Sequence, residues 1–238
     1  MRSSRSATEL LAAAPRGFAH RGLHGAGVPE NSLAAFRAAI ESGAGIECDV
    51  RRSADGVPMV FHDADLNRLC GNGASLDSLP ARTLQSLRLG KSDQSIPTLG
   101  EMLAAVSTAP LLIELKTGRS RVTELCRAVA RDLDRYEGPF AVMSFDPRVP
   151  RWFAAERPAF SRGLVLDGED SWWRREWKRR WSRAQFAAVQ LPAIERQWVS
   201  GWRNAGMGVA CWTIRDRAGR WTAEIHADAL IWEGDGRP

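Results

Sequence analysis

Short apolar runs alternate with longer amphipathic stretches along nearly the whole chain. Each run is bounded by Gly, Pro, Asp or Ser, as buried β-strands are, and most of the stretches between the runs have the apolar spacing of helices. The predicted strands are Gly17–His20, Gly45–Val50, Val57–His62, Leu111–Lys116, Ala141–Phe145, Gly163–Leu166, Ala187–Leu191, Gly208–Ile214 and Ala229–Glu233. This alternation predicts an α/β fold.

The second and third predicted strands break the alternation, because only Arg51–Gly56 separates them. A parallel crossover needs a dozen or more residues, so these two strands must form a hairpin. Asp55-Gly56 is a strong hairpin signal, and counting back from this turn places Asp49 opposite His62. We therefore expect the third strand to leave the main sheet and to bring His62 beside Asp49.

Eight strands remain without the returning one, and most of them are followed by a helix, in a chain of 238 residues. This arrangement predicts a TIM (β/α)8 barrel, with residues 1–238 as a single domain. The hairpin arm and the loop after it form an insertion over about residues 51–96, and the turn-rich part, about 64–96, is expected over the barrel mouth. An open doubly wound sheet is the competing fold, but no GxGxxG or P-loop pattern follows any strand.

The composition, 44% apolar and 26% charged, excludes low-complexity disorder for most of the chain. No apolar stretch approaches the roughly 18 residues of a membrane span, and Leu10–Ala14 is too short for a secretory signal. The four cysteines show no CxxC or zinc-ligand spacing, so we expect reduced thiols in a cytoplasmic protein. The net charge of +5 favours anionic partners but does not indicate a nucleic-acid-binding protein.

Candidate chemistry lies near the ends of two predicted strands. The strand period of two places Glu47 and Asp49 on one face and Cys48 on the other, and it likewise places Glu114 and Lys116 on one face. If the hairpin is an excursion, these two strands are neighbours in the barrel. We therefore expect three carboxylates and one lysine to converge at the mouth.

Converging carboxylates repel one another, and burial without a cation would raise at least one carboxyl pKa strongly. A divalent cation resolves this conflict, and oxygen-only ligands favour Mg2+ or Ca2+ over zinc. The alternative is that Glu47, Asp49 and Glu114 pair with arginines in a polar layer of the barrel. Residue spacing alone does not choose between the two interpretations.

Two histidines lie at strand ends and are expected to face the same mouth. They are His20, followed by Arg21-Gly22, and His62, followed by Asp63. Imidazole has an ordinary pKa near 6.5, so two such groups beside a metal-bound substrate can act as acid and base. Arg21 and Lys116 add the positive charge that binds phosphate oxygens.

The order of motifs resembles the glycerophosphodiester phosphodiesterase family. The matching motifs are His20-Arg21-Gly22, Pro29-Glu30-Asn31-Ser32, Ala35-Phe36, Gly43-Ala44, Glu47-Cys48-Asp49-Val50, Asp55-Gly56, His62-Asp63, Leu66, Ile96-Pro97-Thr98-Leu99-Gly100-Glu101, Ile113-Glu114-Leu115-Lys116, Ser144-Phe145-Asp146 and Trp212-Thr213-Ile214. They cover nearly the whole chain, most densely from Phe18 to Lys116. The chain departs from the family pattern at Arg68–Gly73, at Arg215 and at Trp232-Glu233.

The resemblance implies a TIM barrel that uses one divalent cation, Mg2+ or Ca2+, to hydrolyse glycerophosphodiesters to glycerol 3-phosphate and an alcohol. It assigns the metal to Glu47, Asp49 and Glu114, catalysis to His20 and His62, and phosphate binding to Arg21 and Lys116. Trp212 would line the substrate pocket, with core packing as the alternative, and Phe145 is a weaker pocket candidate.

The expected reaction needs two proton transfers. One histidine would remove a proton from water or from the neighbouring glycerol hydroxyl, and the other would protonate the leaving alcohol. The sequence does not show which histidine does which, and it does not indicate an oligomeric state. The alternatives are a phospholipase D-like or C-like activity on lysophospholipids and a non-catalytic barrel that binds phosphate or a membrane.

The segment Trp172–Trp181 combines tryptophans with basic residues at helical spacing. Trp173, Trp177 and Trp181 share one stripe of the predicted helix. Such a helix can lie in a membrane interface, which gives a possible weak peripheral membrane contact. It can also be an outer barrel helix that packs its tryptophans on the sheet, and we favour this second interpretation. His24, in a glycine-bearing loop, is expected to face solvent.

Overall fold

All nine predicted strands form, and their bounds lie within two residues of those expected. The computed structural model describes residues 6–118 and 120–238. The strands are β1 (Phe18–Ala19), β2 (Gly45–Arg52), β3 (Pro58–Val60), β4 (Leu111–Leu115), β5 (Phe140–Ser144), β6 (Ser161–Leu166), β7 (Phe186–Gln190), β8 (Gly208–Ile214) and β9 (Ala229–Trp232).

Eight of these strands close into a parallel barrel, which confirms the TIM-barrel prediction. Their order around the barrel is β1-β9-β8-β7-β6-β5-β4-β2, and β1 pairs with both β9 and β2. β3 lies outside the barrel and pairs antiparallel with β2. The hairpin arm therefore stays bound to the sheet only through β2 and takes no part in closing the barrel, as its short connection requires.

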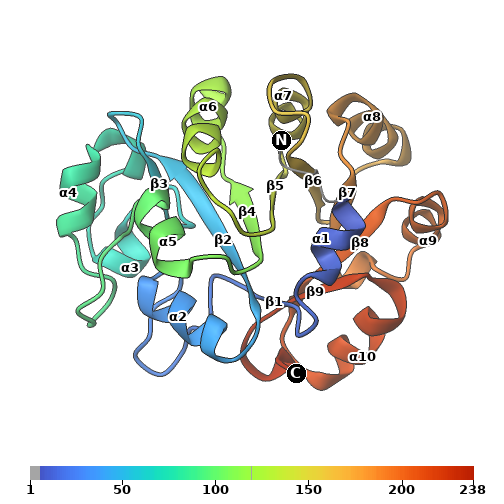
Figure 1. Ribbon diagram of the computed structural model, residues 1–238, viewed down its shortest axis with the longest axis horizontal. Helices are drawn as coiled ribbons and strands as arrows, with labels where there is room; N and C mark the ends of the chain where they lie inside the picture. Colours follow the sequence, from blue (N-terminus) through green and yellow to red (C-terminus); the bar gives the residue numbers. More distant parts are fainter. Residues whose placement is uncertain (1–5, 119) are drawn as a thin grey trace.

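Helices surround the barrel (Figure 1). They are α1 (Ala7–Ala12), α2 (Leu33–Glu41), α3 (Asn67–Cys70), α4 (Ala81–Ser86), α5 (Leu99–Val106), α6 (Val122–Leu133), α7 (Arg148–Glu156), α8 (Trp172–Ser182), α9 (Gln197–Asn204) and α10 (Arg217–His226), with short 3-10 turns at Leu76–Ser78, Leu191–Ala193 and Gly234–Gly236. Side-chain caps mark several starts: Ser32 accepts a hydrogen bond from Ala35 N in α2, and Thr98 and Glu101 form a capping box on α5. Among the helices of the described residues, none is long and apolar enough to cross a membrane.

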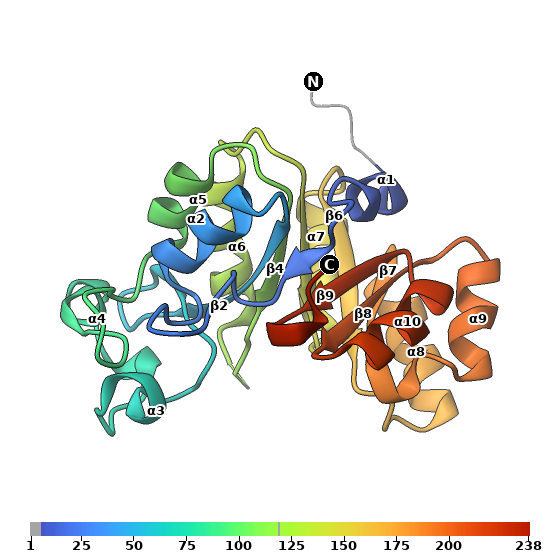
Figure 2. The same ribbon diagram turned by 90° about the horizontal axis from the view of Figure 1, so that it is seen from below.

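The strand alternation divides the interior into two apolar regions and a polar mouth. On β2, Ile46 and Val50 face outward and pack with the surrounding helices. Apolar side chains such as Leu112 and Phe186 fill the barrel interior at the end opposite the mouth, and Leu10 and Leu11 of α1 pack against them. In Figure 2, α1 covers the upper end of the barrel. The polar side chains of the barrel interior therefore lie at the opposite end, which is the mouth.

The hairpin register differs by one residue from the prediction. Val50 pairs with Val60, and Phe61 N donates to Asp49 O at 2.9 Å, so Phe61 rather than His62 lies opposite Asp49. The cause is the turn: Ser53 N donates to Val57 O at 3.0 Å, which makes the loop longer than the two residues Asp55-Gly56. A one-residue shift exchanges the faces of a strand, so Phe61 is buried here and His62 follows after the ladder ends.

The insertion has an apolar cluster of its own, beside β2 and β3 (Figure 1). Met59 and Phe61 from the hairpin arm pack there with Leu66, Leu84 and Ile96, all fully buried. The backbone is tied back to the arm, since Ala54 N donates to Leu79 O at 2.9 Å. The segment lies at the side of the barrel, and its α3 end approaches the mouth through Arg68, described below.

α8 is turned opposite to the favoured prediction. Its tryptophans do not pack on the sheet but face outward, and the only buried residue of this helix is Ser182. The physical reason is that the neighbouring helix α9 supplies the apolar surface. The Arg175 guanidinium lies 4.3 Å from the ring centre of Trp198, and that of Arg179 lies 5.5 Å from Trp202. The inner face of α8 is therefore filled by arginine.

Candidate active site

Three carboxylates meet at the mouth of the barrel, as the strand period predicts. Glu47 and Asp49 come from β2 and Glu114 comes from β4, where Asp49 and Glu114 are register partners. One oxygen from each carboxylate lies within 4.8 Å of one from each of the others. All three residues are buried, and Glu47 and Asp49 are only 1% exposed. Neighbouring parallel strands thus place three negative groups in one buried space.

The turn after β1 brings the first cation to these carboxylates. Arg21 and Gly22 both have positive φ, 56° and 80°. At Gly22 a side chain has no room, because a Cβ atom would lie 2.8 Å from Ala35 of α2. The turn aims the backbone N–H of Arg21 at Glu47, where it donates to Oε2 at 3.0 Å. Glycine is therefore needed here by conformation and by space.

Two cationic side chains flank Asp49. Arg21 Nε lies 3.2 Å from Asp49 Oδ2, and Lys116 Nζ lies 3.2 Å from Asp49 Oδ1 and 2.8 Å from Glu114 Oε1. Asn31 donates from Nδ2 to Asp49 Oδ2 at 3.0 Å. Asp49 is thus the best neutralised of the three carboxylates.

The electrostatics of the cluster are uneven. Burial raises the pKa of Glu47 well above its usual range, and the charges of Asp49 and Glu114 add to this effect. Burial likewise raises the pKa of Glu114 to about 7, although Lys116 opposes the shift. Burial also acts on Asp49, but Lys116 and Arg21 outweigh it and hold the pKa of that carboxyl below its usual value.

A divalent cation fits this site. Three buried carboxylates carry more negative charge than Arg21 and Lys116 offset, and the raised pKa values of Glu47 and Glu114 record the imbalance. An all-oxygen donor set is the one that Mg2+ and Ca2+ prefer. The expected arginine pairing is present as well, because Arg21 reaches Asp49. Arginine pairing therefore accounts for Asp49, and the negative charge of Glu47 and Glu114 that the basic side chains do not offset is suited to a cation.

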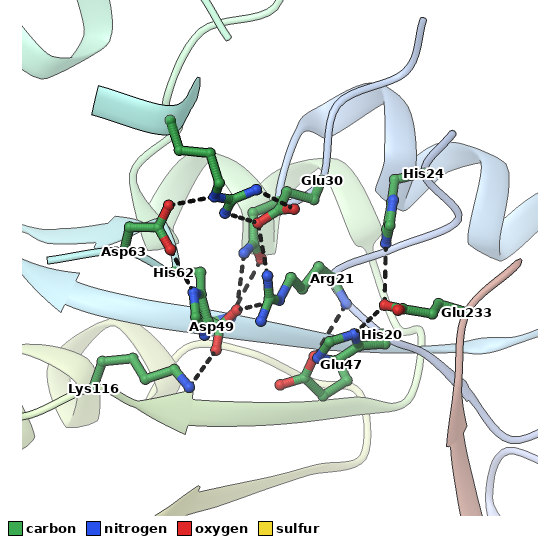
Figure 3. A network of polar contacts seen from close by, with 12 residues as sticks. His20, Arg21, His24, Glu30, Glu47, Asp49, His62, Asp63, Lys116 and Glu233 are labelled. Atoms are coloured by element: carbon green, nitrogen blue, oxygen red, sulfur yellow. Dashed lines mark hydrogen bonds and ion pairs between the residues drawn. The ribbon is translucent and has the colours of Figure 1, made fainter. Parts of the chain in front are cut away.

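His20 is held in place by a carboxylate from the last strand. Its Nδ1 lies 2.6 Å from Glu233 Oε2, and its Nε2 lies 4.0 Å from Glu47 Oε2 (Figure 3). Glu233 also contacts Arg215 Nε at 2.6 Å and His24 Nε2 at 3.6 Å. The hydrogen bond from His20, with the nearby His24 imidazole, lowers the pKa of Glu233. An ionised Glu233 holds the proton on Nδ1 of His20 and leaves Nε2 facing the carboxylates.

His62 is held in the same manner from the opposite side. Its Nδ1 lies 2.7 Å from Asp63 Oδ1, and Arg68 Nε donates to Asp63 Oδ2 at 2.6 Å. Arg68 also bonds both oxygens of Glu30, at 3.0 and 2.7 Å, and Glu30 accepts from Arg21 Nη1 at 2.8 Å. Burial lowers the pKa of His62, although the Asp49 charge opposes this.

A cavity of about 190 Å³ joins these groups. Its lining includes eight of the nine site residues expected from the sequence: His20, Arg21, Glu47, His62, Glu114, Lys116, Phe145 and Trp212. The ninth, Asp49, is buried among them. A larger hollow of about 810 Å³, beside α5 and α6, is lined by none of the nine. The chemistry is therefore concentrated in the smaller cavity.

Phe145 and Trp212 form an aromatic wall of this cavity. Their rings meet edge to face, with centres 5.6 Å apart, and Lys116 Nζ lies 5.7 Å from the centre of the Phe145 ring. Trp212 also packs against the barrel interior, and its Nε1 donates to Ala188 O at 3.0 Å. Both alternatives for Trp212, pocket lining and core packing, therefore hold at once.

Sequence reasoning missed the residues that support the two histidines. Glu30 and Asp63 lie within the matched motifs but had no role, and Arg68 and Glu233 were set apart only as departures from the family pattern. A carboxylate directly after His62 was a local signal. Glu233 had none, because 213 residues separate it from His20. His24, expected to face solvent, is only 24% exposed and lies beside Glu233.

Comparison with known proteins gives one consistent result. The profile of the glycerophosphoryl diester phosphodiesterase family matches residues 20–233. The chain is 32% identical over 143 residues to glycerophosphodiester phosphodiesterase 1 of Homo sapiens, which covers 55% of this chain and 43% of that protein. It is 34% identical over 133 residues to the glycerophosphodiester phosphodiesterase of Bacillus altitudinis, covering 50% and 53%. The chain spans about half the length of the curated relatives that it matches.

Solved structures agree over more of the chain. A phosphodiesterase of Oleispira antarctica, solved with the product sn-glycerol-3-phosphate, is 25% identical and superposes with a TM-score of 0.84 over 94% of both chains. The glycerophosphodiester phosphodiesterase of Thermotoga maritima is 28% identical, with a TM-score of 0.76 over 90% of this chain and 92% of that one. The likeness thus includes the whole barrel.

Proposed function

This chain belongs to the glycerophosphoryl diester phosphodiesterase family, and we propose that it hydrolyses glycerophosphodiesters to glycerol 3-phosphate and an alcohol. The observation that carries this proposal is the cavity in which His20 and His62, each held at Nδ1 by a carboxylate, flank three converging carboxylates. The product bound to the Oleispira antarctica relative, sn-glycerol-3-phosphate, supports the same substrate class.

Glu47, Asp49 and Glu114 are the residues that would hold the divalent cation, Mg2+ or Ca2+. When bound, such a cation offsets negative charge on phosphoryl oxygens. Lys116 and Arg21 add positive charge to the same cavity from two directions, and their contacts with Asp49 fix their positions before substrate arrives. The phosphate of a diester is thereby bound and oriented.

The two histidines provide the proton transfers. Because the Nδ1 of each is occupied, by Glu233 for His20 and by Asp63 for His62, each presents Nε2 as its reactive nitrogen. One neutral imidazole takes the proton of the attacking water or glycerol hydroxyl while a new P–O bond forms. The other imidazole, protonated on Nε2 at the start, gives that proton to the alcohol oxygen as the old P–O bond breaks. The net charge of the protein is then unchanged, because one imidazole has gained a proton and the other has lost one. If the glycerol hydroxyl is the nucleophile, the product of this step is a cyclic phosphate, and a water opens it to glycerol 3-phosphate with the two imidazoles in exchanged roles.

The first prediction concerns activity. With Mg2+ or Ca2+, the protein should release glycerol 3-phosphate from glycerophosphocholine or glycerophosphoethanolamine, and EDTA should abolish the release. His20→Ala and His62→Ala should each lower kcat by about 10²- to 10⁴-fold, since each removes one proton transfer. The measurement is enzymatic detection of glycerol 3-phosphate.

His226→Ala is the matched control, because His226 lies in α10 and its nearest acidic partner is Glu195, at 3.9 Å. It should leave the rate unchanged. A His20 or His62 variant with near-normal rates, both variants being folded by circular dichroism, would contradict the assignment. Release that persists in EDTA would contradict the metal.

A lysophospholipid is a second candidate substrate, favoured by the apolar side of the cavity. Met143, Val165 and Ile231 line it together with Phe145 and Trp212. On lysophosphatidylcholine, a phospholipase D-like reaction would release choline, and a C-like reaction would release phosphocholine. Release of neither, and no glycerol 3-phosphate from the soluble diesters, would favour a barrel that only binds phosphate.

A further inference from the structure

Four tryptophans on α8 are exposed, although tryptophan is among the side chains that gain most from burial. The exposed fractions are 74% for Trp172, 61% for Trp173, 52% for Trp177 and 36% for Trp181. The Trp177 and Trp181 rings stack with centres 5.4 Å apart. Trp173, Trp177 and Trp181 share one stripe of the helix, and we call these three residues the tryptophan ridge.

The contacts that hold α8 on the barrel come mainly from residues outside this ridge. The opposite side of α8 makes the contacts with the rest of the protein, through Ser182, the two arginines that stack on α9, and Lys178, which lies 2.5 Å from Asp170 in the preceding loop. Of the ridge, Trp181 also contacts α7: the Arg151 guanidinium lies 5.7 Å from the centre of the Trp181 ring. The outward direction of the indoles is therefore set by the inner contacts of the helix.

Basic side chains border the ridge. Between residues 172 and 182 the helix contains five arginines and lysines and one acidic residue, Glu176. Arg174 and Arg180 are 60% and 75% exposed, on the two sides of the outward-facing tryptophans. Each has one acidic partner, Asp170 or Glu176, and Glu176 is itself shared with Arg179. The outer face therefore presents indoles within a positive border.

The ridge begins at the mouth side of the barrel. α8 follows β6, and Val165 near the end of that strand lines the active-site cavity. Only Asp167–Ser171 separates β6 from Trp172. In a βα unit the helix begins at the end of the barrel where the strand finishes, so Trp173 is the ridge residue nearest the mouth.

From these observations we propose that the tryptophan ridge docks this protein on the surface of an anionic lipid bilayer. Indole rings partition to the boundary between headgroups and acyl chains, and basic residues beside them are attracted to anionic lipids. The ridge is a convex helical surface, about 12 Å long by helix geometry, and a bilayer accepts such a shape without a matching groove. Docking there places the rim of the barrel mouth beside β6 near the lipid surface.

The test measures binding of the full chain to vesicles, without substrate. Sedimentation should show binding to vesicles of phosphatidylcholine with phosphatidylglycerol, and weaker binding to pure phosphatidylcholine. Replacing two ridge residues, Trp173→Ala with Trp177→Ala, should lower the partition coefficient about tenfold. Arg174→Gln with Arg180→Gln should remove most of the dependence on phosphatidylglycerol.

Trp221→Ala is the matched control, because Trp221 lies on α10 and is 71% exposed. It should bind vesicles as the unaltered protein does. No binding to anionic vesicles, or equal losses in the ridge and Trp221 variants, would overturn the proposal. So would a dimer in analytical ultracentrifugation that the ridge substitutions dissociate, since a second copy would then be the occupant.

Hydrolysis of soluble glycerophosphocholine separates this proposal from the proposed activity. The ridge residues do not line the active-site cavity, so the two ridge substitutions should leave that rate unchanged. A catalytically silent protein that still binds vesicles through the ridge would contradict the activity and support the docking. An active protein without vesicle binding would do the reverse.

Discussion

At the scale of single residues, each candidate catalytic histidine owes its orientation to an acidic partner. His20 uses Glu233 from the far end of the chain, whereas His62 uses the next residue, Asp63. A carboxylate on Nδ1 fixes the tautomer and the ring orientation. Glu233 is therefore a positioning residue that acts through His20, and its contact with Arg215 helps to hold it.

Replacing Glu233 should show this role. Glu233→Gln should lower kcat by about 10- to 1,000-fold with little change in KM, because the amide no longer fixes the proton on Nδ1 of His20. Steady-state kinetics with glycerophosphocholine measure both constants. Glu233→Asp keeps the acceptor and should recover part of the rate, which a purely structural defect would not allow. Unchanged kcat in the glutamine variant would refute the role.

At the scale of elements, the register of a strand and the direction in which its side chains point decide which side chains meet. The β2–β3 hairpin is one residue away from the register predicted from its turn, yet His62 still comes close enough for the charge of Asp49 to act on it. The reason is that His62 lies beyond the ladder, where strand alternation no longer sets its direction, and Arg51 Nε donates to its backbone oxygen at 2.6 Å. In the barrel, glycines adjust the strands to large neighbours: at Gly163 of β6 a Cβ atom would lie 2.2 Å from the ring of Phe186.

A methyl group at Gly163 should therefore destabilise the barrel. Gly163→Ala is expected to lower the free energy of unfolding by about 1–3 kcal/mol, because the Phe186 ring must shift within a packed interior. Urea unfolding followed by fluorescence measures the change. Gly201→Ala is the control: in α9 nothing lies near its added Cβ, and alanine in a helix should add up to about 1 kcal/mol. Equal stability of both variants would contradict this packing argument.

At the scale of the whole molecule, the polar mouth places uncompensated negative charge inside a folded barrel. Burial raises the pKa values of Glu47 and Glu114, the latter to about 7 from an ordinary 4.5. In the metal-free protein these carboxyls keep protons that the unfolded chain has already released. The free energy of unfolding should therefore fall as the pH rises from about 4.5 toward about 7.

A bound cation should reverse this loss. At a concentration a hundredfold above its Kd, Mg2+ or Ca2+ adds about 2.7 kcal/mol, which for a chain of this size raises Tm by about 5–10 °C. The increase should be larger at pH 8 than at pH 5.5, where protons on Glu47 and Glu114 compete with the cation. Differential scanning fluorimetry with and without EDTA measures it. A shift independent of pH, or one retained in Glu114→Gln, would place the cation elsewhere.

The sequence by itself determined the fold class and most of the site. The alternation of apolar runs located all nine strands, and the strand period of two placed Glu47, Asp49 and Glu114 on the inner face, because both are local properties of the chain. The single-domain, cytoplasmic interpretation stays a prediction. Family membership agrees with the order of motifs.

Only the tertiary structure decided which distant groups meet. Glu233 reaches His20 because β9 closes the barrel against β1, a contact that no local pattern contains. The link from His62 through Arg68 and Glu30 to Arg21 likewise depends on the insertion folding back. The facing of α8 was not readable, because its periodicity shows that the tryptophans share a stripe but not which neighbour the helix has. Arg175 and Arg179 of α8 pack against the tryptophans of α9, and the tryptophan stripe of α8 therefore faces outward.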